Sequence, residues 1–69
     1  MMNAETVPAL WNKAETYARQ GQWAAALAQY DNVLARDPGH AMAMLRASRM
    51  ALSLGRYRDG LDYTLRALA

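Results

Sequence analysis

Hydrophobic and polar residues follow the period of an α-helix along this chain, in successive runs separated by turn residues. The clearest run places Trp23, Leu27, Tyr30 and Leu34 at positions i, i+4, i+7 and i+11, which aligns them in one stripe over three turns. Similar runs cover residues 7–20, 41–54 and 57–68. The pattern therefore predicts an all-α chain of four helices.

The boundaries of these runs carry residues that start or stop helices. Thr6 precedes Pro8, so that a hydroxyl can cap free amide groups while a proline occupies the first turn. Gly21 and Gly55 each end a run, because glycine readily adopts the left-handed conformation that terminates helices. The triplet at residues 37–39, Asp-Pro-Gly, ends another, because proline cannot continue a helix. Links this short predict that successive helices are antiparallel neighbours.

The second half of the chain repeats the first half at one fixed offset. This offset aligns residues of the same size class, namely Gly21 with Gly55, Trp23 with Tyr57, Ala26 with Gly60, Leu27 with Leu61, and Leu34 with Leu68. It also aligns Ala14 with Ser48, which is the small residue required where two helices touch. Few of the paired residues are identical, so what is repeated is the size of the side chain at each packing position.

Several of these features together resemble the tetratricopeptide repeat. They are the period of 34, the glycine followed two residues later by an aromatic residue, the small residue three positions further on, and the closing Asp-Pro. The resemblance implies a short right-handed α-solenoid over residues 7–69, with one repeat at 7–40, an incomplete repeat at 41–69, and a flexible N-terminus at 1–6. Lys13, Gly60 and Thr64 depart from the usual family residues.

Composition and charge narrow the possible functions. The 69 residues include no cysteine and one histidine, His40, which excludes disulfides and argues against a structural metal. The net charge of +2 divides into −1 for residues 1–38 and +3 for residues 39–69, where all five cations are arginines. These arginines do not form one stripe, so a solvated surface is favoured over nucleic-acid binding. No apolar run is long enough for a membrane span, and a cytoplasmic location is expected.

The sequence offers no set of residues suited to catalysis. It contains no glycine-rich phosphate loop, no pair of carboxylates suggesting acid–base chemistry, and no partner for a serine nucleophile. His40 is expected to be a solvated residue leading into the third helix. The aromatic side chains of Tyr17, Trp23, Tyr30 and Tyr57 are predicted to pack in the core. We therefore expect a non-enzymatic protein without cofactors.

The resemblance also implies where a partner would bind. In this family the first helix of each repeat lines a concave groove, and the matching residues form a mixed apolar and charged set. The predicted groove residues are Trp11, Asn12, Glu15, Met42, Leu45, Arg46, Arg49 and Leu52. A peptide or helix of a protein partner is the expected ligand. The alternative is that other parts of the chain, or a second copy, cover these side chains.

The last predicted helix leaves an apolar face without a partner. Leu61, Leu65 and Leu68 would be covered by a following repeat, so they are predicted to mediate self-association, giving a homo-oligomer, most simply a dimer, in an isolated fragment. An alternative of another class is that the chain is the N-terminal region of a larger enzyme. Related bacterial segments commonly precede sulfotransferase or glycosyltransferase domains, where they dimerise the enzyme or orient its substrate.

Overall fold

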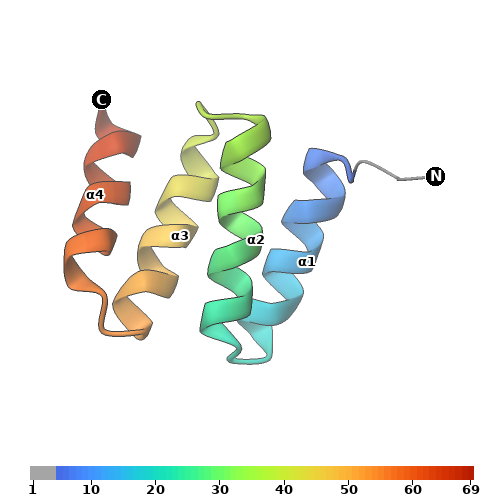
Figure 1. The fold of residues 1–69 in the computed structure, drawn as a ribbon, viewed down its shortest axis with the longest axis horizontal. Helices are drawn as coiled ribbons and strands as arrows, with labels where there is room; N and C mark the ends of the chain where they lie inside the picture. Colours follow the sequence, from blue (N-terminus) through green and yellow to red (C-terminus); the bar gives the residue numbers. More distant parts are fainter. Residues whose placement is uncertain (1–4) are drawn as a thin grey trace.

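The computed structural model describes residues 5–69, which form four α-helices lying side by side in chain order (Figure 1). The helices are α1 (Val7–Arg19), α2 (Trp23–Arg36), α3 (Ala41–Ser53) and α4 (Tyr57–Leu68). Each helix packs against the next one and runs antiparallel to it. The predicted all-α architecture of two helix pairs is confirmed. Within the predicted N-terminal segment, residues 1–4 lie outside the described residues.

The two helix pairs close with the same turn, at equivalent positions of the repeat. Gly21 has a φ of 73° and Gly55 a φ of 76°, a region that glycine occupies without steric cost. In the first turn the amide of Gln22 donates to the carbonyl of Tyr17 at 2.9 Å, and the amide of Arg56 repeats this bond in the second turn at 2.8 Å to Ala51. This pattern is a Schellman motif, which satisfies the last free carbonyls of a helix. The repeat seen in the amino-acid sequence is therefore also present in the backbone structure.

The first helix of each pair is capped by a side chain. The Thr6 hydroxyl accepts a hydrogen bond from the amide of Ala9 at 3.3 Å, as the sequence predicts. At the start of α3, Nδ1 of His40 accepts from the amide of Ala43 at 3.1 Å. His40 is partly buried, so the expectation of a merely solvated lead-in residue is wrong. The capping position requires an acceptor, and Nδ1 of His40 supplies it.

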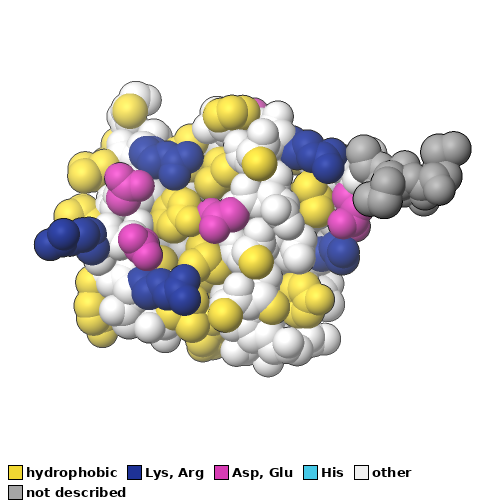
Figure 2. Space-filling view, viewed as in Figure 1, with side chains coloured by type: hydrophobic (Ala, Val, Ile, Leu, Met, Phe, Trp, Pro, Cys, Tyr) yellow, Lys and Arg dark blue, Asp and Glu magenta, His cyan; other side chains and the backbone are white. Residues whose placement is uncertain are grey.

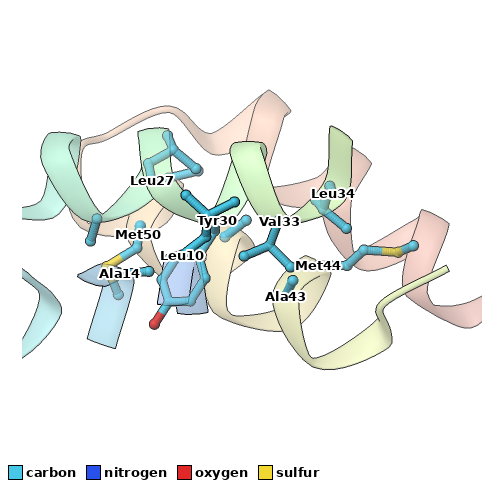
Figure 3. Close-up of a cluster of buried hydrophobic side chains, with 12 residues drawn as sticks. Leu10, Ala14, Leu27, Tyr30, Val33, Leu34, Ala43, Met44 and Met50 are labelled. Atoms are coloured by element: carbon cyan, nitrogen blue, oxygen red, sulfur yellow. The ribbon is translucent and has the colours of Figure 1, made fainter. Parts of the chain in front are cut away.

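The core runs between the helices and centres on Tyr30. Figure 3 shows the Tyr30 ring among Leu10, Val33 and Met50, with its hydroxyl oxygen at the edge of the cluster. Tyr30 and Val33 are the largest side chains that are fully buried. The complete set of buried hydrophobic residues is Leu10, Ala14, Ala26, Leu27, Tyr30, Val33, Leu34, Ala43, Met44, Ala47, Met50 and Ala51. The many alanines allow the helices to approach closely.

The aromatic residues do not all pack as the sequence predicts. Tyr30 is buried and Tyr17 packs against the core from its edge, in agreement with the prediction. Trp23 is 37% exposed and Tyr57 is 70% exposed, so the core assignments of both residues are wrong. Both residues open the second helix of a repeat, and Tyr57 is the more exposed because α4 packs mainly against α3 in the described residues, whereas α2 packs against both α1 and α3. One side of α4 therefore stays open to solvent.

Candidate functional site

One depression of the surface lies between the first helices of the two repeats. Both α1 and α3 pack against α2, and the space between them is a hollow of about 240 Å³. We call it the concave hollow; its lining residues are Glu15, Ala18, Arg19, Trp23, Tyr30, Arg46, Arg49 and Met50. Three arginines face one carboxylate, so the lining carries an excess of positive charge.

A polar network crosses the concave hollow and joins three helices. The hydroxyl of Tyr30 on α2 donates to Glu15 on α1, and Nη1 of Arg46 on α3 lies 3.2 Å from both carboxylate oxygens. Burial, and then the hydrogen bond to Glu15, raise the pKa of Tyr30 well above its usual value. Glu15 and Arg46 are 21% and 35% exposed, so the pair is partly shielded from water. Arg46 is thus held in place by the fold.

Trp11 forms one rim of the hollow through three contacts. Its ring meets the Tyr30 ring edge-on, with centroids 5.4 Å apart, and stacks on the His40 ring at 5.2 Å with an interplanar angle of 23°. The Arg46 guanidinium lies 5.8 Å from the centroid of the Trp11 ring. A cation at this distance is attracted by the electron-rich face of an indole. Trp11 is partly buried by these neighbours and couples α1 to the start of α3.

A stripe of exposed side chains runs along α3 beside the concave hollow. Met42, Leu45, Arg49 and Leu52 fall at i, i+3, i+7 and i+10, which places them on one face of the helix. Met42 is 47% exposed, Leu45 41% and Leu52 47%. Arg49 is exposed and forms no salt bridge with any residue of the described part of the chain. We call these four residues the α3 stripe.

The structure brings together some of the predicted groove residues and separates others. Glu15, Arg46 and Arg49 line the concave hollow, and Trp11 stands at its rim. Asn12 lines a different depression, of about 340 Å³, on the outer side of α1. Its other lining residues are Ala9, Lys13, Thr16, Tyr17 and Gln20. The residues predicted for self-association, Leu61, Leu65 and Leu68, lie exposed on α4, away from both depressions.

Several residues of this site are not among the predicted groove residues. Arg19, Trp23, Tyr30 and Met50 line the hollow, and His40 stacks on Trp11 at its rim. One signal could have found the central ion pair, since Glu15 and Arg46 have opposite charges 31 residues apart. That offset is three less than the repeat period, and three residues are about one turn of a helix. Stacked repeats bring such positions on α1 and α3 to the same level.

Two negative findings concern the described residues alone. Residues 5–69 contain no cluster of three or more His, Cys, Asp or Glu side chains suited to holding a metal ion. Over the same range, no helix combines the length and the apolar character needed to cross a membrane.

Comparison with known proteins identifies a family. The family model described as the tetratricopeptide repeat matches residues 7–40, which comprise α1, α2 and the turn that leads into α3. The second helix pair repeats the same turn and the same order of helices, so about two repeats fit the chain. No curated protein and no solved structure matches the chain.

Proposed function

This chain belongs to the tetratricopeptide repeat family, and we propose that it binds a peptide or helix of a partner protein along the α3 stripe and the concave hollow. Tetratricopeptide repeats generally mediate protein–protein interactions and typically act as non-catalytic scaffolds. The proposal assigns that general role to one surface of this chain.

The observation that carries the proposal is the difference between Arg46 and Arg49. Arg46 is engaged with Glu15 at 3.2 Å, whereas Arg49 lies in the same hollow, exposed and without an ionic partner in residues 5–69. A planar guanidinium binds a carboxylate through two parallel hydrogen bonds, so Arg49 favours an acidic group on the ligand. Arg46 fixes the wall of the hollow, and Arg49 is the residue that contacts the partner.

Apolar anchoring comes from the side chains beside Arg49. Leu45 precedes Arg49 by one helical turn and Met42 precedes Leu45 by three residues, so a ligand that reaches Arg49 also passes over them. Methionine is flexible and polarisable, which suits a surface that adapts to ligand side chains. The preferred ligand is therefore a segment with apolar residues spaced along one face and an acidic residue about one turn away.

Peptide selection followed by affinity measurement tests this proposal. Selection from a random peptide display library against the immobilised chain is expected to enrich peptides with an acidic residue beside apolar residues. Fluorescence anisotropy then gives the dissociation constant of a selected peptide. Arg49→Glu should weaken binding by roughly tenfold or more, because it replaces an attractive contact by repulsion. Leu45→Ala should weaken binding by several-fold, on the order of the loss of one apolar contact.

A matched charge reversal elsewhere controls for net charge. Arg56 is also exposed but lies in the turn before α4, outside the concave hollow, so Arg56→Glu should leave the dissociation constant unchanged. Circular dichroism should show equal helicity for all three variants, since their side chains are at the surface. If a selected peptide binds the folded Arg49→Glu variant as tightly as the parent chain, the proposed site is wrong.

A further inference from the structure

The outer side of α4 exposes the same positions that are buried in the first repeat. Leu27 and Leu34 on α2 are 5% and 6% exposed, because α3 packs over them. Their equivalents in the second repeat, Leu61 and Leu68, are 58% and 76% exposed. Figure 2 shows hydrophobic side chains at the surface along α4, with charged side chains beside them. This face is distinct from the concave hollow, and a partner that covers it must match the apolar and charged side chains of α4.

The exposed side of α4 consists of two parallel rows. Tyr57, Leu61, Leu65 and Leu68 fall at i, i+4, i+8 and i+11, which forms an apolar row along the helix. A second row, Arg58, Asp62 and Arg66, follows at intervals of four residues beside it and carries alternating charges. Leu65 is 56% exposed, so the apolar row is open over its whole length.

When α4 packs antiparallel to the α4 of a second copy, the apolar row of one copy faces that of the other, and the charged row of one copy meets opposite charges in the other. A two-fold axis near Thr64 places Asp62 opposite Arg66 of the second copy, and Arg66 opposite Asp62. The same register brings Leu61 opposite Leu68 of the second copy and keeps Leu65 near the axis. The N-terminal Arg58 then lies near the C-terminal end of the other α4, where the helix dipole favours a cation. A register centred one turn earlier would also pair Arg58 with Asp62 but would leave Leu65 and Leu68 uncovered.

The other end of the solenoid does not fit the α4 face. The outer side of α1 presents Asn12, Lys13, Thr16 and Gln20 beside Ala9 and Tyr17. A head-to-tail stack of two copies would bury the Lys13–Glu5 ion pair and the side-chain amides of Asn12 and Gln20 against the α4 leucines, at a desolvation cost. A closed two-fold contact uses the same patch on both copies and avoids that cost.

We infer that two copies of this chain associate through α4, antiparallel and two-fold symmetric, with Leu61, Leu65 and Leu68 at the centre and reciprocal Asp62–Arg66 ion pairs at one edge. The inference is independent of ligand binding in the concave hollow. One helix of 12 residues offers less area than a standard stable interface, so the dimer dissociates on dilution.

Sedimentation equilibrium over a range of protein concentrations tests the inference. The parent chain should approach twice its monomer mass at high concentration. Leu65→Lys should give the monomer mass throughout, because it places a charge at the apolar centre of the contact. Leu45→Lys is the matched control, since Leu45 is also exposed but lies on α3 beside the concave hollow, and this variant should dimerise like the parent.

A charge-swap experiment tests the register. Asp62→Arg alone and Arg66→Asp alone should each weaken the dimer by roughly tenfold, because each places like charges opposite each other at two symmetric positions. The double variant carrying both changes should regain the parent affinity. A parent chain that stays monomeric at all concentrations would overturn the inference, as would a folded Leu65→Lys variant that still dimerises. Failure of the double swap to restore affinity would refute the two-fold register.

Discussion

The contact between the two helices of each repeat combines side chains of different sizes in the two repeats, and this difference predicts an effect on stability. Ala18 and Ala26 of the first repeat correspond to Leu52 and Gly60 of the second. A Cβ atom at Gly60 would lie 3.0 Å from Cδ2 of Leu52 and 3.1 Å from its Cγ atom. The glycine therefore makes room for the leucine, and the perturbation to study is Gly60→Ala with and without Leu52→Ala.

Two opposing contributions set the magnitude. Alanine is about 1 kcal/mol more favourable than glycine inside a helix, mainly because it loses less backbone entropy on folding. Forcing an extra methyl group into a packed contact costs about 1–3 kcal/mol. We expect Gly60→Ala alone to lower the free energy of unfolding by about 1 kcal/mol. In the Leu52→Ala background the clash is gone, and the same substitution should raise it by about 1 kcal/mol. The coupling energy is then about 2 kcal/mol.

Urea unfolding of the four proteins of this cycle, followed by far-ultraviolet circular dichroism at one protein concentration, gives the coupling energy. Ala28→Gly measures the alanine–glycine difference at an exposed position in the middle of α2 and should cost about 1 kcal/mol. If Gly60→Ala has the same effect in both backgrounds, Leu52 is not what the glycine accommodates. A loss of stability from Gly60→Ala in the Leu52→Ala background would show that Leu52 is not the source of the clash.

Two other predictions concern side chains that join neighbouring elements. Burial, and then the hydrogen bond to Asp31, raise the pKa of Tyr63 above its ordinary value, so the unfolded chain ionises first as the pH rises. Stability should therefore fall above about pH 10, and Tyr63→Phe should make that fall shallower in urea midpoints measured across this range; an unchanged slope would contradict this assignment. His40→Ala removes the acceptor for the Ala43 amide and should lower the free energy of unfolding by about 1 kcal/mol, measured by thermal unfolding, whereas His40→Asn should retain most of the parent stability. Equal losses in the two variants would instead assign the effect to stacking on Trp11.

The helices could be predicted from the sequence because their limits are set locally. Gly21 and Gly55 take positive φ angles, Thr6 accepts a hydrogen bond from a nearby amide, and the proline after Asp37 stops α2. Each of these effects involves residues no more than four positions apart and depends on a characteristic residue type, such as glycine at a positive φ angle or proline after the end of a helix. The stripe of hydrophobic residues then fixes which side of each helix faces the core. The predicted helices differ from the observed ones only near their ends; for example, the run predicted over residues 41–54 forms a helix that stops at Ser53.

The site could be predicted only in part, because its contacts join residues about one repeat apart. Arg46 and Arg49 look equivalent in the sequence, yet only Arg46 meets Glu15. That difference depends on the distance between α1 and α3, which no local spacing encodes. In the same way, Tyr63 reaches Asp31 across 32 residues and links α4 to α2. The sequence contains the charges, and the packing of α2 decides which of them pair.

Chemical-shift mapping by nuclear magnetic resonance can locate a bound peptide residue by residue, and so tests whether the ligand lies along the α3 stripe and the concave hollow. A ¹⁵N-labelled sample of the chain would be titrated with a peptide selected for binding, at a protein concentration held constant. Binding at the proposed site should give the largest amide shifts along the α3 stripe, around Leu45 and Arg49, and at Ala18 across the concave hollow. Shifts confined instead to the outer side of α1, around Ala9 and Lys13, would contradict it.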